Sequence, residues 1–249
     1  MKSLIYIVLI LIPALGVAQI PDQFSNEKLA IQHKKEFDTK CKQIGLHAKP
    51  EYYYKKNINI NKYQELKSLG VDLKVMDLKT HGGFTYQEYS LMSNIVIKGK
   101  VIEKIYDADR ESYFHTTVKV EVQEVVKGEN LPKIINLKLR SGLIGENKYV
   151  KSSDEPEFEI DGETVFLFLS KVPYHEMVEQ KEKGFFQHKI PENYKRLNDY
   201  YLEGKFVVKL DYVFDDLNNN VGKIQDITSS IQAIEKVNNS NQFYQRSYK

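Results

Sequence analysis

The sequence has very little cysteine and no tryptophan. Cys41 is the only cysteine in 249 residues, and a single thiol cannot cross-link its own chain. Stability must therefore come from a hydrophobic core, which a chain of roughly 230 residues is long enough to build. The absence of tryptophan makes glycan binding less favoured, although 17 tyrosines remain whose rings could stack on a sugar.

The chain also has little net charge. Its formal charge is +2, and removal of a leader that contains Lys2 would lower it to +1. Such a balance gives no overall attraction to nucleic acid or to an anionic membrane surface. We therefore expect no nucleic-acid partner.

A long apolar run occurs at the N-terminus alone. Leu4–Ile12 are uninterrupted apolar residues, Pro13 follows, and Gly16-Val17-Ala18 place small residues where a signal peptidase reads them. The run is shorter than the roughly 20 residues that a membrane anchor needs. Residues 1–18 are therefore predicted to be a signal peptide cleaved after Ala18. The mature protein is expected in the periplasm or outside the cell, with no membrane span.

Residues 19–84 are predicted to form a helical or mixed N-terminal extension. Ser25 caps the expected first helix and Gly45 ends it. One stripe of this helix is apolar apart from a histidine: Leu29, His33, Phe37, Cys41 and Ile44. His33 and Cys41 share a face, but two ligands without a third make a poor metal site. The stripe therefore favours a core position.

The rest of this extension is less regular. Residues 61–70 predict a short helix capped by Asn61 and ended by Gly70. Residues 51–56 and 71–78 have the composition of strands.

From Thr85 onward the pattern is that of a β-rich domain. Thr85 and Glu88 form a capping box for a short helix that ends near Ser93. A strand follows, with Gly99 inside it marking a sharp bend that lets one strand serve two sides of a small barrel. Its inward residues are Ile95, Ile97, Val101 and Ile105, and Lys98, Lys100 and Lys104 point outward.

Three more strands follow by the same logic. Residues 114–123 alternate strictly, with Thr116, Val118, Val120 and Val122 inward. The next strand turns Ile135, Leu137 and Leu139 inward. Residues 164–169 are apolar on both faces, so another element must cover their second side.

The C-terminal part is predicted to resume the sheet after an insertion at residues 174–204. Residues 204–210 form a strand, and residues 211–224 form a hairpin or an irregular strand pair. A last helix has Thr228 as its cap and Ile231, Ile234 and Val237 as its apolar edge. Residues 238–249 are expected to be a flexible tail.

These pieces stand in a familiar order: "SNIVIKGKVIEK", "TTVKVEVQEVVKGENL", "FEIDGETVFLFL", "GKFVV" and "TSSIQAIEKV". The order resembles that of secreted bacterial proteins with an OB-like, TIMP/netrin-like β-barrel, over roughly Thr85 to Val237. The resemblance implies a mainly β (α+β) fold: a five-stranded OB-like Greek-key barrel in residues 85–237, with an N-terminal helical extension and a C-terminal helix. It also implies a face that binds an oligomer, a glycan or a protein, and it implies no activity.

The chain departs from this resemblance in two ways. Metalloproteinase inhibitors of this fold class chelate the zinc of their target through a cysteine at the mature N-terminus. Here the expected terminus is Gln19 and the cysteine is internal. The helix that is common between the third and fourth barrel strands is not apparent either.

Motifs for metal chemistry are incomplete. His175–Glu179 read His-Glu-x-x-Glu, which lacks the second histidine of a zinc-protease helix. The stretch from Asp216 has acidic and amide side chains at odd positions, but Val221 and Ile227 replace the glycine and glutamate of a calcium loop. The exposed pair Asp107 and Asp109 gives weak calcium ligation at most.

No nucleophile elbow, phosphate loop or C-x-x-C motif is present, and the six histidines are scattered. We therefore predict no catalytic residue, no metal site and no cofactor. The leading interpretation is a non-enzymatic exported binding module. The alternatives are a protease-inhibitor-like protein and a hydrolase whose site assembles in space.

The predicted binding face is the outer surface of the second and third barrel strands. It would place five basic groups against the single acid Glu121, and would meet an acidic glycan or an acidic protein partner. The alternative is that these charges only keep the sheet soluble. The candidate ligand-binding residues are Lys98, Lys100, His115, Lys119, Lys138 and Arg140.

The cleavage site can be tested by intact-mass measurement on protein from its native host. We expect a chain that begins at Gln19, either free or cyclised to pyroglutamate. A mass that still includes residues 1–18 would contradict the prediction of export.

Overall fold

The computed structural model describes residues 23–46, 56, 58–79, 83–106, 115–128, 131–144, 148–152, 155–158, 162–171 and 200–240. The helical elements are α1 (Gln23–Ile44), η1 (Ile60–Lys62), α3 (Tyr63–Ser68), α4 (Leu73–Leu78), α5 (Tyr86–Met92) and α8 (Ile224–Asn239). The strands are β1 (Ile95–Tyr106), β2 (Thr116–Lys127), β3 (Ile134–Leu139), β4 (Gly142–Ile144), β5 (Lys148–Val150), β6 (Thr164–Lys171), β7 (Tyr200–Lys209), β8 (Tyr212–Phe214) and β9 (Asn220–Lys223).

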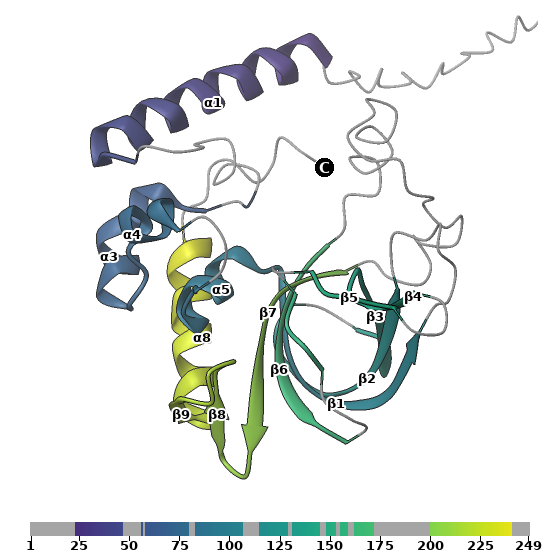
Figure 1. The fold of residues 1–249 in the computed structure, drawn as a ribbon. Coiled ribbons are helices and arrows are strands. Elements are labelled where there is room, and N and C mark those ends of the chain that lie inside the picture. Colours follow the sequence, from purple (N-terminus) through teal and green to yellow (C-terminus); the bar gives the residue numbers. More distant parts are fainter. Residues whose placement is uncertain are drawn as a thin grey trace, which may run out of the picture.

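Seven strands form one antiparallel sheet in the order β3-β2-β1-β6-β7-β8-β9, and β4 pairs with β5 separately. Figure 1 shows this sheet strongly curled, with the helices gathered on one side of it. The chain is thus an α+β protein built around a large antiparallel sheet, as expected. Among the described residues no strand pairing joins β3 to β7, so the sheet is not closed into a five-stranded barrel.

Strand β1 is shared by two neighbours. It pairs with β2 along most of its length and with β6 over Ile95–Lys100. The β1–β2 register shifts between Lys98 and Gly99, which is a bulge at the predicted bend. A Cβ at Gly99 would lie 2.5 Å from Cγ1 of Val120, so only glycine allows β2 to approach this closely.

The concave side of the curled sheet encloses the first core. Its members confirm predicted inward positions on three strands: Ile95, Ile97, Val101, Val118, Val120, Ile135, Leu137 and Leu139. Strand β6 adds Val165, Leu167 and Leu169 from one of its two apolar faces. Three predicted orientations are wrong. Ile105 is 41% exposed, because a further register shift between Val101 and Glu103 changes the alternation of β1. The same shift sets Lys104, expected outward, opposite Val118, where its ammonium donates to the Phe158 carbonyl at 3.1 Å. His115 was expected outward and is 6% exposed.

The burial of His115 follows from its position just before β2. Its backbone N–H donates to the carbonyl of Leu139 at 2.8 Å, so the chain is still held against β3 at this residue. Gly142 lies over the His115 carbonyl, where an added Cβ would come within 2.5 Å of the oxygen. The residues after β3 therefore cover a histidine that alternation alone places in solvent.

The convex side of the sheet forms a second core with the helices. Phe166 and Phe168 of β6 pack there with Phe206, and α8 adds Ile227 and Ile231. This confirms the prediction that another element covers the second apolar face of β6. Both α5 and α8 lie against this side in Figure 1.

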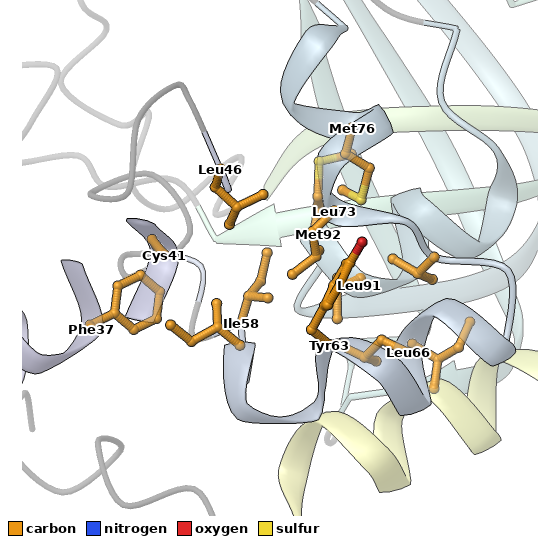
Figure 2. Close-up of a cluster of buried hydrophobic side chains, with 13 residues drawn as sticks. Phe37, Cys41, Leu46, Ile58, Tyr63, Leu66, Leu73, Met76, Leu91 and Met92 are labelled. Atoms are coloured by element: carbon orange, nitrogen blue, oxygen red, sulfur yellow. The ribbon is translucent and has the colours of Figure 1, made fainter. Parts of the chain in front are cut away.

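A third core joins the N-terminal helices, as Figure 2 shows. Phe37 and Cys41 of α1 are buried there as predicted, and burial raises the pKa of the Cys41 thiol to about 12. The strand proposed for residues 71–78 is wrong. Leu73 and Met76 are instead buried three residues apart on α4, and the carboxylate of Asp72 caps this helix by accepting from the backbone N–H of Lys74.

The predicted helix boundaries are confirmed in part. The capping box of Thr85 and Glu88 is present at the start of α5. Thr228 does not cap α8, which begins one turn earlier at Ile224, where the backbone N–H donates to the carbonyl of Asp211. Asn61 does not cap α3 either, because it lies within η1 and Lys62 is the residue before the helix.

Several sequence predictions lie outside the described residues. They are the signal peptide, the strand at 51–56 except Lys56, the motif at His175–Glu179, the pair Asp107 and Asp109, and residues 174–199 of the expected insertion. Strand β7 begins at Tyr200, four residues before the predicted strand. No helix in the described ranges has the length and apolar character required to cross a membrane.

The first core can be tested with charged substitutions. Val118 and Leu167 have no exposed surface, so Val118→Asp or Leu167→Asp should abolish cooperative unfolding. An unpaired buried charge costs several kcal/mol, against a total stability of about 5–15 kcal/mol. Gln123→Asp on the exposed side of β2 is the control and should melt like the wild type. Native thermal melting of either core variant would show that the strand phases are wrong.

Candidate functional site

An open cleft lies between the outer face of the β1–β2 pair and the start of α8. Its volume is about 690 Å³. The turn between β7 and β8 and the end of β9 form its remaining walls. The cleft is lined by Lys98, Glu124, Asp211, Tyr212, Lys223, Ile224, Gln225, Thr228 and Ser229.

The local fold explains how these side chains meet. Lys98 and Glu124 are directly opposite each other in the β1–β2 register. Strands β8 and β9 pair as a hairpin, which sets Tyr212 against Lys223. The hydrogen bond from Ile224 N–H to the Asp211 carbonyl, 3.0 Å long, then fixes the first turn of α8 against the β7–β8 turn.

The charges of the cleft balance. Lys98 and Lys223 contribute two positive charges, and Glu124 and Asp211 contribute two negative ones. Opposite charges on directly facing strand positions attract each other, which applies to Lys98 and Glu124. The ammonium of Lys223 lies 6.0 Å from the centre of the Tyr212 ring. The cleft therefore offers strong donors and acceptors together without favouring either sign of charge.

One polar atom in the cleft lacks a partner. The hydroxyl oxygen of Thr228 is buried and has no hydrogen bond among the described residues. Buried polar atoms in proteins are nearly always satisfied by protein, water or ligand. Because this oxygen has almost no accessible surface, a group in the cleft could reach it only after the Thr228 side chain rotates.

The six predicted site residues do not form a single site. Lys98 lines the cleft, and Lys100 lies on the same strand, opposite Glu121. Lys119 and Lys138 are on the outer face of β2 and β3, where they were expected. His115 is buried, so it is not part of an outer face.

The predicted face carries more acidic groups than the single one counted, so its positive charge is partly neutralised. Lys119 pairs with Glu103 at 2.5 Å, and Arg140 pairs with Glu155 at 3.2 Å. Lys138 donates to the hydroxyl of Thr117. The prediction counted Glu121 alone, because Glu103 and Glu155 lie on segments whose placement beside these strands depends on the register and on the path of the loop.

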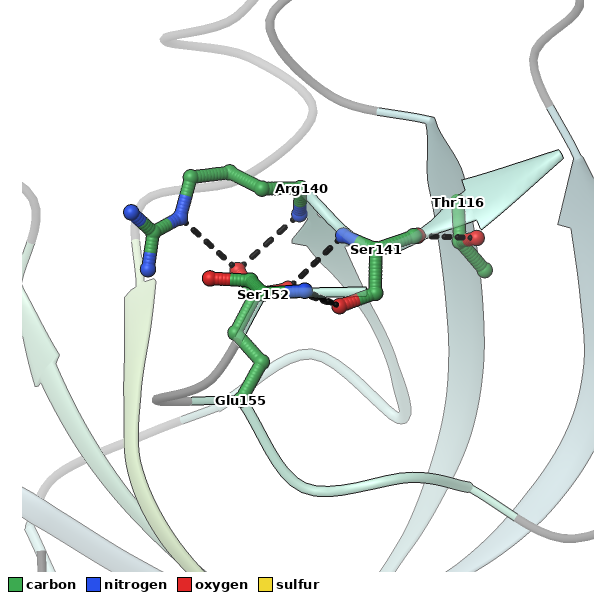
Figure 3. A network of polar contacts seen from close by, with 5 residues as sticks. All are labelled: Thr116, Arg140, Ser141, Ser152 and Glu155. Carbon is green, nitrogen blue, oxygen red and sulfur yellow. Dashed lines mark hydrogen bonds and ion pairs between the residues drawn. The ribbon is translucent and has the colours of Figure 1, made fainter. Parts of the chain in front are cut away.

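Arg140 belongs to a polar network that Figure 3 shows in detail. Glu155 accepts from both the backbone N–H and Nε of Arg140, at 2.9 and 3.2 Å. It also accepts from the backbone N–H and the hydroxyl of Ser141, at 2.9 and 3.0 Å. Ser141 Oγ in turn accepts from Ser152 N–H, and Thr116 Oγ1 donates to the Ser141 carbonyl.

This network holds the chain in place after β3. The carboxylate oxygens of Glu155 are already occupied by four donors, so they are poorly placed to take a proton from Ser141. Residues 155–158, which we call the strap, are held by Glu155 at one end. At the other end, Lys205 of β7 donates to the Glu157 carbonyl at 2.6 Å.

The strap also inserts an aromatic ring into the first core. Phe158 is buried there, and the ammonium of Lys205 lies 4.8 Å from its ring centre. Lys205 forms a buried ion pair with Glu163 at 2.9 Å. The strap therefore bridges the space between β3 and β7, where the sheet is not closed.

A serine–lysine pair within the described residues also has the form of a catalytic site. Lys56 Nζ donates to the hydroxyl of Ser170 at 2.9 Å, and it also forms an ion pair with Glu203. Serine–lysine pairs serve as nucleophile and base in some hydrolases. Here, an ammonium paired with a carboxylate has no lone pair with which to accept the serine proton. Ser170 is also 5% exposed, which closes it to a substrate.

Metal ligands do not cluster in the part of the chain that the structure describes, where no three His, Cys, Asp or Glu side chains could hold one ion. The stretch at Asp216, which lacks two ligands of a calcium loop, lies in the predicted hairpin of residues 211–224 and forms its turn between β8 and β9. Here, Asp215 accepts from the backbone N–H groups of Leu217 and Asn219, and Asn218 has a φ of 61°. The predicted hairpin is confirmed.

The sequence signalled one residue of the cleft and missed the others. Lys98 was chosen from its strand phase, while Glu124, Asp211 and Gln225 had no distinguishing motif. These residues come from separate segments, so only the fold brings them together.

No model of a known protein family matches the chain, and no curated protein is significantly similar to it.

Lys127, close to the same helix, gives a test of the packing between α8 and the sheet. Its ammonium donates to the carbonyl of Ser90 at 2.7 Å, and burial lowers its pKa to about 8 from the usual 10.5. Below about pH 8 the buried charge destabilises the native protein in full. Between these two values the unfolded chain binds more protons, so the contribution of Lys127 to stability rises with pH.

We therefore expect Lys127→Met to stabilise the protein by on the order of 1–3 kcal/mol near neutral pH, because the side chain is only partly buried and its hydrogen bond to Ser90 is lost. The gain should shrink toward zero as the pH approaches 10.5. Urea unfolding at several pH values measures the gain as the difference in unfolding free energy between the variant and the wild type. Burial raises the pKa values of Cys41 and Tyr89 to about 12, so these groups make stability fall at high pH. Both proteins contain them, so their effect cancels in the difference. Lys133→Met, at a side chain that is 82% exposed, should show no such trend. A gain independent of pH would contradict the lowered pKa.

Proposed function

We propose that the protein is an exported binding module on an OB-like barrel, and that the cleft beside α8 is its binding site. The strands β3-β2-β1-β6-β7 follow one another as the resemblance to OB-like barrels leads one to expect. OB-folds are partly open barrels, which accommodates the space bridged by the strap. The core enclosed by these strands supports the same assignment.

The observation that carries the proposal is the composition of the cleft wall. Ammonium, carboxylate, amide and hydroxyl groups converge from the sheet, the β7–β8 turn and α8. A concave site with a few convergent polar groups is the usual form of a small-molecule site, and about 690 Å³ is within the common range. Binding requires such groups alone, whereas hydrolysis would also need an activated nucleophile.

The outer face of β2 and β3 is the less favoured site. An acidic partner there would have to displace Glu103 from Lys119 and Glu155 from Arg140. The Arg140 pair is also part of the network that holds the strap, so opening it would cost stability. The cleft requires neither rearrangement.

A cleft-filling variant tests the proposal. Gln225 is exposed in the first turn of α8 and lines the cleft, so Gln225→Trp should occupy it. Gln232→Trp, at an exposed position on the same helix that does not line the cleft, is the matched control. Ligand-observed NMR with a mixed metabolite library should give hits for the wild type and the control that disappear with Gln225→Trp. Hits that persist with Gln225→Trp would exclude the cleft as the binding site.

A further inference from the structure

The balance of charge in the cleft determines what kind of molecule it can hold. An anionic ligand would face Glu124 and Asp211, and a cationic ligand would face Lys98 and Lys223. Either would suffer repulsion comparable to the attraction that it gains. A neutral ligand that carries donors and acceptors side by side meets no such opposition.

Hydroxyl groups suit this wall in a specific way. A hydroxyl donates one hydrogen bond and accepts others, so one group can accept from Lys98 and donate to Glu124 at the same time. Both bonds would be charge-assisted, and such bonds are stronger than those between neutral groups. Since Lys98 and Glu124 face each other on adjacent strands, a single hydroxyl can lie between their charged ends.

The helical wall adds a row of uncharged polar groups. Gln225, Thr228 and Ser229 are three and four residues apart, so their side chains emerge on one face of α8. All three line the cleft, and the side chains of Gln225 and Ser229 are exposed there. A ligand with several hydroxyls can satisfy this row and the Lys98–Glu124 pair together.

The cleft also offers an apolar surface. Tyr212 and Ile224 both line the cleft; Tyr212 is 38% exposed and Ile224 is partly exposed. An aromatic ring with a polar rim is suited to a ligand that has one apolar face and a polar edge. The C–H face and the hydroxyl edge of a pyranose ring have this arrangement.

We infer that the cleft binds a neutral saccharide of about two sugar rings. The inference rests on the proposed function, because it names the ligand class of the same site. Glu124 and Lys98 would hold ring hydroxyls, Gln225 and Ser229 would bond to further hydroxyls, and the Tyr212 ring would pack against a sugar face. The volume of about 690 Å³ accommodates a molecule of this size.

Calorimetric titration with defined sugars tests the inference. Four neutral disaccharides serve as ligands: cellobiose, maltose, lactose and N,N′-diacetylchitobiose. Cellobiouronic acid and the deacetylated disaccharide chitobiose serve as an acidic and a basic sugar of the same size. At least one neutral disaccharide should bind the wild type. The two charged disaccharides should bind about tenfold more weakly or worse, because attraction and repulsion in the cleft offset each other while the charge still loses its hydration.

Variants assign the binding to the cleft. Glu124→Ala and Tyr212→Ala should each weaken the neutral sugar about tenfold or more, because each removes a direct contact. Glu103→Ala is the matched control: Glu103 is exposed on the neighbouring strand, outside the cleft, and should leave the affinity unchanged. Thermal melts confirm that all variants are folded before titration.

The outcomes separate this inference from the proposed function. Absence of binding by all four disaccharides at millimolar concentration would overturn the inference, as would tighter binding of a charged sugar or unchanged affinity in Glu124→Ala. If library hits are still lost with Gln225→Trp, only the ligand class is wrong. If those hits survive in Gln225→Trp, the cleft itself is the wrong site and both proposals fail.

Discussion

The two-sided burial of β6 is the constraint on which the rest of the structure depends. Phe166, Leu167 and Phe168 are consecutive and all fully buried, so both faces of this strand must be covered. The curled sheet covers one face and α5 with α8 cover the other. Because α8 must lie on the convex side, its first turn comes to rest beside the outer face of β1 and β2. The apolar contact between α8 and the sheet ends near the start of the helix, where the facing side chains are polar, and the cleft lies there.

The polar cleft and the apolar core beside it therefore share the same elements. On α8, Ile227 and Ile231 are buried against the sheet, while Gln225 and Ser229 are exposed on the same stretch of helix. On β1, Val96 is buried on the convex side and Lys98, two residues later, lines the cleft. The core fixes both walls by packing, so the polar groups are held on regular structure. A site supported in this way keeps its geometry without a ligand.

Local pattern predicted much of the fold. Strict alternation placed Val118 and Val120 correctly, and a double-sided apolar run correctly required a cover for β6. The inward orientation predicted for Ile105 was wrong because a bulge changes the phase of a strand, and composition gives no sign of it. A strand was predicted in place of α4 because a stretch of six residues is too short to distinguish the helical period from the strand period. The cleft was beyond prediction since Lys98, Glu124, Asp211 and Gln225 meet only through strand register and the position of a helix.

The strap also affects whether the strand edges of the sheet are open to another chain. Strand β3 pairs with β2 on one side, and the first half of β7 pairs with β6 on one side, so within the described residues each leaves an edge facing the other. An open strand edge is a template on which another chain can add a strand. Phe158 and the contacts of Glu155 and Lys205 place residues 155–158 over these edges. Residues 155–158 therefore cover part of the strand edge that β3 and β7 would otherwise present to a second chain.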